Sequence, residues 1–313
     1  MPANTKEIKR RIKSISSTLQ VTKALEMISS VKMRKASQLT LQSREFSNGV
    51  WQLITQLRAG AGENLPDLFA PRGKATRRLI VLIASDKGLA GSYNSNVLRA
   101  TSRYIKENDA ETDVVTVGKK AAKIAGYNGS ANIISSFDCD SEGFDFFAAS
   151  PISKFILDSY LGGQYKSVAV SYTGFVNTLK QAATVKTILP IGASETSVSD
   201  SESDSVIPTE VEGSLSIQKD QDSTDKATDY KYEPDKMSIL RTLGRLAVRS
   251  QIYQALLEAS ASEHAARMVA MKNATENGNE LVGDLKFSFN KLRQQSITQE
   301  IAEISAGRIA LVK

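Results

Sequence analysis

The residues that most invite a chemical role form the segment SDKGLAGSYN, Ser85 to Asn94, which lies between an apolar run and a helical pattern. A glycine-bearing turn in this position can cradle the phosphates of a nucleotide. Gly88 and Gly91 are spaced GxxG, however, which is neither GxGxxG nor GxxxxGK[ST], and no acidic pair, metal cluster or nucleophile elbow accompanies them. We interpret them as a tight turn or a contact surface, and VTVGKKAA (115–122) likewise as a joint between strand and helix.

The sequence has one cysteine and one histidine, the two residue types that most often bind metals or act as nucleophiles and bases. A lone Cys139 excludes an intrachain disulfide and a cysteine metal cage, and it favours a reducing compartment. His264 lies among alanines in SASEHAARM, and we expect it at the surface or at an interface. Neither residue predicts catalysis, and we predict no cofactor or metal.

The last helical stretch, SITQEIAEI (296–304), carries apolar side chains at helical spacing: Ile297, Ile301 and Ile304. Between them stand a hydroxyl, an amide and a carboxylate, at Thr298, Gln299 and Glu300. These groups exchange hydrogen-bond partners readily, and each net bond is worth only about 0.5–1.5 kcal/mol. The pattern suits reversible contacts better than chemistry.

Composition is that of a globular protein, with 313 residues, 41% of them apolar, 24% charged, and a net charge of +6. The longest apolar run, LIVLIA (79–84), is far too short to cross a bilayer, and the first residues have no apolar core typical of a signal peptide. Two alternatives stay open from these features: a nucleic-acid-binding protein, suggested by the basic charge, and a nucleotide-dependent α/β enzyme, suggested by the glycine turn.

Two arms are predicted to be long helices, residues 1–58 and 236–313, and neither 4–58 nor 236–313 contains a proline. In the first, apolar residues recur at Ile8, Ile12, Ile15 and Leu19, and a rotated stripe continues at Val21, Leu25, Ile28 and Val31; we expect both stripes to face another helix. At about 1.5 Å per residue, this arm would be roughly 80 Å long. The second arm begins after Asp235, a candidate cap, and Gly278 and Gly283 could bend or break it. We predict that the two arms pair as an antiparallel coiled coil.

Residues 75–193 are predicted to form an α/β domain between the arms. Five strand candidates alternate with helix candidates: 77–85, 113–118, 131–137, 167–175 and 184–190 for the strands. This alternation indicates a mainly parallel, Rossmann-like sheet. Residues 194–235 are different, with twelve Asp/Glu against three Lys and few apolar residues, and we predict an acidic flexible insertion there.

Five motifs in this order resemble the gamma subunit of F-type ATP synthases, bacterial type: VTKALEMISSVKMRKA (21–36), SDKGLAGSYN (85–94), YKYEPD (230–235), SQIYQALLEASASEHAARMVAMKNATENG (250–278) and NKLRQQSITQEIAEISAG (290–307). The resemblance covers both arms and the sheet domain. It implies a central rotor shaft, one copy per complex, standing inside a ring of three alpha and three beta subunits. It also implies a globular part that meets the epsilon subunit and the membrane c-ring, which carries protons or sodium ions.

Some positions depart from the usual family pattern. Leu25 stands where methionine is common, and Ala90 and Ser92 replace the commoner cysteine and glycine. Chloroplast relatives carry a redox-active cysteine pair in an added segment, and residues 194–235 contain no cysteine, so that switch is expected to be absent. Without a convincing organelle presequence, we expect a peripheral protein on the cytoplasmic face of a bacterial plasma membrane.

The resemblance implies two sets of contact residues and no catalytic site within this chain. Contacts with the alpha/beta ring are implied for two groups: Leu25, Lys32, Arg34 and Lys35 on the first arm, and Arg293, Gln294, Thr298, Gln299 and Glu300 on the second. Contacts with epsilon or the membrane ring are implied for Lys87, Gly88, Tyr93 and Asn94. Two interpretations of the basic first arm stay open: charge complementarity with acidic loops of the ring, or the solvated face of a coiled coil.

Overall fold

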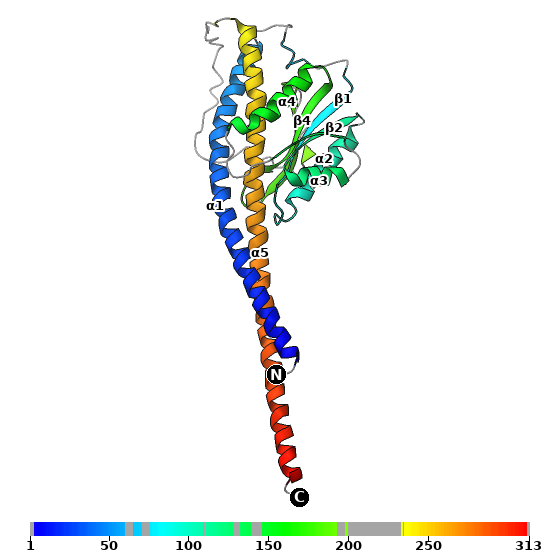
Figure 1. Ribbon diagram of the computed structural model, residues 1–313. Coiled ribbons are helices and arrows are strands. Elements are labelled where there is room, and N and C mark those ends of the chain that lie inside the picture. Colours follow the sequence, from blue (N-terminus) through cyan, green and yellow to red (C-terminus); the bar gives the residue numbers. More distant parts are fainter. Residues whose placement is uncertain are drawn as a thin grey trace.

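The computed structural model describes residues 3–59, 65–70, 75–108, 110–127, 132–138, 146–192, 198–199, 233 and 235–311. Two long helices, α1 (Ala3–Ala59) and α5 (Lys236–Leu311), lie side by side and form a rod (Figure 1). An α/β domain, residues 77–189, packs against one side of the rod near the end where α1 finishes and α5 begins. The predicted architecture, mixed α/β with two long terminal helices, is confirmed.

The α1–α5 pair is antiparallel, and two hydroxyl contacts fix its register. The Oγ1 atoms of Thr22 and Thr275 are 2.8 Å apart, and the Oγ atoms of Ser47 and Ser250 are 2.7 Å apart. These contacts are separated by 25 residues on each helix, so the two helices run past each other in step. Extending the register, Ala3 at the start of α1 lies opposite Gln294, and α5 continues alone beyond it (Figure 1).

The middle of the seam between the two helices is built mainly from small and polar side chains, contrary to the prediction for part of α1. The residues that α1 buries there are Ser29, Met33, Ala36, Thr40 and Ser43, spaced three, four and seven residues apart. The stripe expected to face α5 is instead exposed at Val21, Ile28 and Val31, and only partly buried at Leu25. Small side chains let the two backbones approach closely, so in this stretch the α5-facing side of α1 is its less hydrophobic side, whereas nearer its end α1 buries Val50, Ile54 and Leu57.

Helix α5 runs for 76 residues without a break, so Gly278 and Gly283 do not end it. A Cβ on Gly278 would lie 2.5 Å from Cδ2 of Leu19, which shows that this glycine allows the two helices to pack closely. At the other end, the carboxylate of Asp235 accepts a hydrogen bond from the backbone N–H of Ser238 at 3.0 Å. The side chain of Ser238, followed by this backbone bond, lowers the pKa of Asp235 through hydrogen bonding. The backbone bond confirms the predicted role of Asp235 as the helix cap.

The sheet has the strand order β3-β2-β1-β4-β5-β6. Its strands are β1 (Arg77–Ile83), β2 (Thr112–Val117), β3 (Asn132–Phe137), β4 (Tyr165–Phe175), β5 (Gln181–Leu189) and β6 (Val198–Ser199). The first four pair in parallel, while β5 is antiparallel to β4 and β6 is antiparallel to β5. The five predicted strands are all present, and the sheet is mainly parallel as expected.

Helices cover both faces of this sheet. One apolar cluster includes Leu79 and Val81 of β1 with residues of α4 (Ala149–Leu161) and α5. The other includes Ile80 and Leu82 of β1 with residues of α2 (Tyr93–Glu107) and α3 (Lys119–Tyr127). Helix α5 is therefore shared: it contributes to the domain core through Ile252 and Leu256, and it also forms half of the rod. A short 3-10 helix, η1 (Phe146–Ala148), precedes α4.

At the end of the sheet where the parallel strands begin, a buried carboxylate forms hydrogen bonds with three neighbouring side chains. Asp113 is 1% exposed and accepts hydrogen bonds from Arg77 Nη2 at 2.9 Å, Asn132 Nδ2 at 3.1 Å and Tyr165 Oη at 2.9 Å. Its oxygens are thus well satisfied despite burial. Burial, followed by the hydrogen bond to Asp113, raises the pKa of Tyr165 to about 12.

We expect the contribution of the Tyr165 hydroxyl to stability to vanish at high pH. The folded-state pKa of about 12 exceeds the unfolded value of 10.0, so the contribution is complete below about pH 10 and is lost as the pH rises towards 12. Urea unfolding of Tyr165→Phe should therefore show a deficit of about 1–2 kcal/mol at pH 8 that shrinks steadily above pH 10. A deficit that stays constant from pH 8 to 11.5 would contradict the assignment.

Two predictions made from the sequence lie outside the described residues. Cys139 is one of them. The acidic insertion is the other, apart from the two residues of β6, Glu233 and Asp235.

Candidate contact surfaces

The stretch of α5 beyond α1 is a single helix with apolar side chains in the open. Ile297, Ile301 and Ile304 are exposed, Ile304 to 73%. They stand four and three residues apart and share a face with Arg293 and Glu300, which are also exposed. Folding of this chain alone does not bury the apolar stripe on the isolated helix, so this face is available for another molecule.

The polar residues predicted on this stretch are all exposed, although they do not share one face. Thr298 donates its hydroxyl proton to the carbonyl of Gln294 at 2.9 Å, which leaves the oxygen free to accept. Gln299 points to the side opposite the isoleucines and donates to Glu303 Oε1 at 2.9 Å. Glu300 accepts from Ser296 Oγ at 3.3 Å. The helix therefore presents exchangeable polar groups around its circumference, as a contact inside a surrounding sleeve would need.

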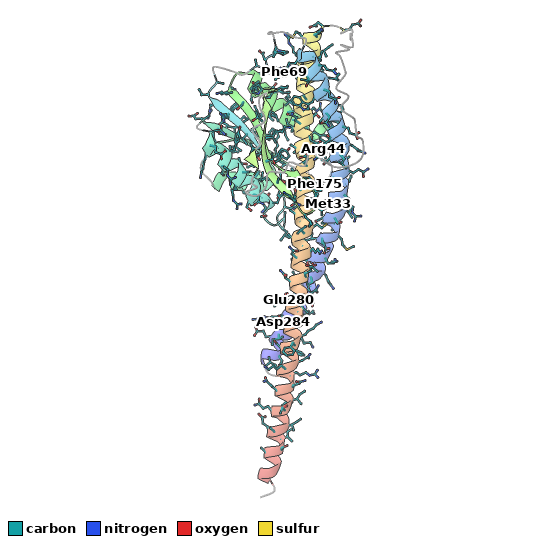
Figure 2. All side chains as sticks on the ribbon, turned by 180° about the vertical axis from the view of Figure 1, so that it is seen from behind. Met33, Arg44, Phe69, Phe175, Glu280 and Asp284 are labelled. Atoms are coloured by element: carbon teal, nitrogen blue, oxygen red, sulfur yellow. The ribbon has the colours of Figure 1, made fainter. Side chains whose placement is uncertain are left out.

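The lower part of α1 shows a second apolar surface, the stripe that sequence reasoning assigned to the seam. Val21, Met27, Ile28 and Val31 are all more than half exposed, and Val31 is 68% exposed. Figure 2 shows the rod below the α/β domain, with Met33 on α1 where the domain ends and Glu280 and Asp284 farther down α5. Because α5 already covers the opposite side of α1, a further partner must cover this stripe if it is to be buried.

The other residues predicted on this arm lie beside the stripe. Arg34 and Lys35 are exposed, while Leu25 and Lys32 are partly buried. Basic side chains thus flank an apolar strip, which is a composition typical of protein interfaces rather than of a smooth nucleic-acid-binding face. Phe287 on α5, 73% exposed, belongs to the same kind of surface and was missed because the seam pattern did not include it.

The loop between β1 and α2 divides into an exposed and an internal half. Lys87 and Gly88 are exposed, whereas Tyr93 is buried and donates its hydroxyl proton to the carbonyl of Ala259 on α5 at 3.2 Å. The side-chain oxygen of Asn94 accepts a hydrogen bond from the backbone N–H of Ser85 at 3.1 Å and closes the turn. Of the four residues predicted to touch a partner here, Lys87 and Gly88 are accessible, and Tyr93 and Asn94 position the loop.

Below this loop, α5 carries a buried polar cluster that sequence reasoning did not identify. Arg267 donates to Glu263 Oε1 at 2.6 Å and contacts His264 Nδ1 at 3.3 Å. Burial raises the pKa of Glu263, and the charge of Arg267 opposes the rise. His264 was expected at the surface or an interface; it is instead 4% exposed, inside the molecule. The i, i+4 spacing of glutamate and arginine was a visible signal, but exposed pairs show the same spacing.

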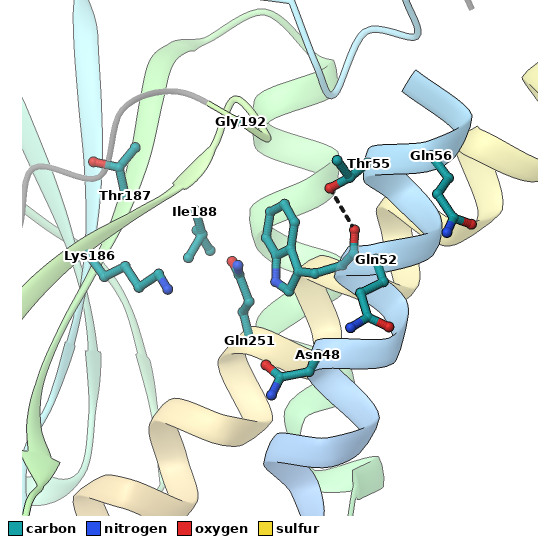
Figure 3. Close-up of a pocket in the computed structure, with 10 residues that line it drawn as sticks. Asn48, Gln52, Thr55, Gln56, Lys186, Thr187, Ile188, Gly192 and Gln251 are labelled. Atoms are coloured by element: carbon teal, nitrogen blue, oxygen red, sulfur yellow. Dashed lines mark hydrogen bonds between the residues drawn. The ribbon is translucent and has the colours of Figure 1, made fainter. Parts of the chain in front are cut away.

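A groove of about 690 Å³ lies between α1, α5 and β5 (Figure 3). Amides and hydroxyls line most of it, together with Trp51, Ile188 and Lys186: the polar ones are Asn48, Gln52, Thr55, Gln56, Thr187 and Gln251. The Thr55 hydroxyl donates a hydrogen bond to the backbone carbonyl of Trp51 at 2.9 Å. Among the described residues that line the groove, Lys186 is the one ionisable side chain.

Two classes of site can be tested against the part of the chain that the structure describes. Within it, no group of three or more His, Cys, Asp or Glu side chains converges as a metal site would require. Likewise, none of the described helices has both the length and the apolarity to cross a bilayer. In the glycine turn at 85–94, Gly88 and Leu89 are exposed, the side chain of Asn94 accepts the N–H of Ser85, and Arg267 donates to the carbonyl of Gly88.

Comparison with known proteins agrees with this geometry. The family model described as ATP synthase matches residues 4–311. The ATP synthase gamma chain of Roseiflexus sp. (strain RS-1) is 35% identical over 317 residues, covering 100% of both chains. That of Christiangramia forsetii is 36% identical over 314 residues and covers 99% of both.

Two solved structures share the fold. A chain of the Euglena gracilis mitochondrial ATP synthase, in rotational state 3, superposes with a TM-score of 0.62 at 17% identity, covering 98% of this chain and 94% of its own. A chain of the Tetrahymena thermophila mitochondrial ATP synthase central stalk and c-ring superposes with a TM-score of 0.57 at 23% identity, covering 81% of this chain and 99% of its own. With relatives more than 30% identical over the full length and a family model that spans nearly every residue, the chain belongs to the family of ATP synthase gamma chains.

Proposed function

We propose that this chain is the central rotor shaft of an F-type ATP synthase, which couples ion-driven rotation of a membrane ring to ATP synthesis and hydrolysis in a surrounding catalytic ring. The observation that carries the proposal is the length of α5 that α1 leaves uncovered, with exposed isoleucines and exchangeable polar groups on all sides. Such a helix needs a sleeve to bury it, and family membership supplies the kind of sleeve: the catalytic ring of an ATP synthase.

The mechanism follows from the asymmetry of the rod. Near its C-terminal tip the rod is one helix, nearer the α/β domain it is two, and the exposed stripe of α1 lies on one side only. A shaft of this kind cannot touch three equivalent neighbours in the same way. Each orientation therefore favours a different conformation, and hence a different nucleotide affinity, in each neighbour, because coupling requires contact free energies that differ between states.

The proposed contacts with the alpha and beta subunits, three of each, are made by the uncovered part of α5 and by the lower part of α1. On α5 these residues are Arg293, Gln294, Thr298, Gln299 and Glu300, and on α1 they are Leu25, Lys32, Arg34 and Lys35. Hydroxyl, amide and single-charge contacts are individually weak, so the shaft can leave one neighbour and engage the next without a deep energetic trap.

The α/β domain and the loop at Lys87 and Gly88 are proposed to meet the epsilon subunit and the membrane ring. In this assembly one copy of the chain sits peripherally on the cytoplasmic face of a bacterial plasma membrane. The chain makes and breaks no bonds itself, and the catalytic sites belong to the ring.

Co-purification tests the proposal. We expect the tagged chain, expressed with its own operon partners, to be recovered at one copy per complex with a ring of three large subunit pairs and with ATP hydrolysis activity. The same preparation should not shift duplex DNA in a salt-dependent way, which would be the behaviour of the alternative nucleic-acid-binding protein. Recovery of the chain alone, or with nucleic acid and no ATPase, would overturn the proposal.

A further inference from the structure

The turn at Leu89 holds a backbone conformation that ordinary residues avoid. Its φ angle is 62°, and among the described residues it is the one non-glycine position with a positive φ. Leu89 is 64% exposed, so burial of its own side chain does not compensate for the backbone. A leucine remains in this region only where the surroundings hold the backbone in place.

Arg267 of α5 grips the peptide group that sets this angle. Its Nε and Nη2 atoms both donate to the carbonyl oxygen of Gly88 at 3.3 Å, and Nη2 also reaches the carbonyl of Lys87 at 3.4 Å. The carbonyl of Gly88 and the N–H of Leu89 belong to one planar peptide unit. A change in φ of Leu89 rotates that unit, so the Gly88 carbonyl could not turn while Arg267 holds it.

Arg267 is itself fixed, which a clamp requires. The residue is 7% exposed, the Glu263 carboxylate accepts from it at 2.6 Å, and His264 Nδ1 lies 3.3 Å from Nη1. Arginine has only donors, so Nδ1 of His264 must act as the acceptor. The rigid, planar fork of the guanidinium matches this set of acceptors, and the flexible ammonium of a lysine does not.

We propose that Arg267 is a positioning residue that holds the loop 85–92 on α5 and maintains the left-handed conformation of Leu89. The clamp fixes the outward direction of the exposed Lys87 and Leu89 side chains relative to the rod. Tyr93, bonded to Ala259, and Gly91, whose added Cβ would lie 3.8 Å from Ala270 Cβ, secure the far side of the loop on the same helix. The inference concerns the conformation of the chain itself and does not depend on the proposed rotor function.

Hydrogen exchange on the full-length chain tests the clamp at two amides. The N–H of Tyr93 bonds to the Ala90 carbonyl at 3.2 Å, and the N–H of Lys119 bonds to Asp86 Oδ1 at 2.9 Å, so both report on the loop. In Arg267→Lys we expect both amides to exchange roughly tenfold faster, because local opening becomes easier. Unchanged exchange in this variant would overturn the proposal.

A second substitution distinguishes a clamp on φ from general loss of packing. Leu89→Gly should slow the exchange again in the Arg267→Lys background, because glycine adopts a positive φ without steric cost. Leu89→Ala should not, because alanine keeps the cost. Equal effects of glycine and alanine would show that Arg267 does not set this angle.

Removal of Arg267 also strips a buried carboxylate of its partner, so one more variant separates that effect. The pair Glu263→Gln with Arg267→Met removes both charges together, and we expect the two amides still to exchange fast and still to be slowed by Leu89→Gly. Lys272→Met, an exposed residue of the same helix with a partner 3.9 Å away at Glu276, is the matched control and should change neither amide. If the two amides of the double variant exchange as in the wild type, the disturbed Glu263 charge and not the loss of the clamp explains the faster exchange in Arg267→Lys. In that case the proposal fails.

Discussion

Gly118→Ala is expected to destabilise the α/β domain by about 3 kcal/mol or more, among the largest effects that a single methyl group can have. Gly118 links β2 to α3 with φ of 98°, and an added Cβ would lie 2.2 Å from the carbonyl oxygen of Ala84. The obstacle is backbone and cannot move aside. The N–H of Ala84 bonds to Val117 at 3.0 Å, and the carbonyl of Ser85 accepts from Lys120 at 3.0 Å, so the hydrogen bonds of two strand ends hold it in place.

Gly163→Ala provides the matched control for this prediction. Gly163 also has a positive φ, 75°, but an added Cβ would meet no atom within 4 Å. Gly163→Ala should therefore lower the free energy of unfolding only by the cost of a positive φ in alanine, about 1–2 kcal/mol. Urea midpoints measured for both variants separate the contributions. If Gly118→Ala unfolds at the same urea concentration as Gly163→Ala, the Ala84 carbonyl is not the obstacle that the structure shows.

The α/β domain could be predicted well from sequence because its signals are local. The run LIVLI (79–83) is wholly apolar and rich in β-branched residues, as a strand buried on both faces must be, and it forms the buried part of β1. Asp235 bears a side chain whose preferred place is a helix cap, and the cap formed. Gly118 was correctly placed at a strand–helix joint, although the carbonyl that excludes a side chain there comes from Ala84, which lies far away in the sequence.

The face of α1 that meets α5 was predicted at Leu19, which lies against Gly278, but not at Val21, Ile28 and Val31, and the reason is physical. Hydrophobic periodicity indicates that a side chain will be buried, and it does not say by which partner. The stripe with Val21, Ile28 and Val31 is the more apolar one, while α5 packs on Ser29, Ala36 and Thr40. Closeness of approach decides the pairing, since small side chains on both helices allow contacts such as Leu19 against Gly278. The exposed stripe then retains its pattern for a partner outside this chain.

The Arg267 cluster escaped prediction for a related reason. Glu263 and Arg267 are spaced like many solvent-exposed ion pairs, yet both are buried, and the loop 85–92 from a distant part of the sequence contacts Arg267. The loop's carbonyls then provide the remaining acceptors. A pair whose function depends on a third, distant segment leaves no separate sign in the local pattern.

Deletion of residues 296–313 is expected to separate folding from function more clearly than any single substitution. The register places Ala3 opposite Gln294, so α1 does not cover the deleted helix, and its described side chains through Ala306 are almost all exposed. We therefore expect the unfolding free energy to change by less than about 0.5 kcal/mol. ATP hydrolysis by the assembled complex should fall by roughly tenfold, since a coupling free energy of that size commonly links distant sites.

A finer pair of variants tests the polar contacts within the same stretch. Thr298→Val with Glu300→Gln should lower turnover several-fold while the complex stays assembled, because a hydroxyl and a negative charge are lost and the isoleucine face is retained. Thr242→Val is the matched control: its hydroxyl bonds to the backbone four residues earlier at 3.0 Å, as that of Thr298 does at 2.9 Å, yet it lies at the opposite end of α5. Equal turnover in both variants would remove the polar groups from the mechanism, and a full-rate complex after the deletion would mean that torque passes entirely through the two-helix part of the rod.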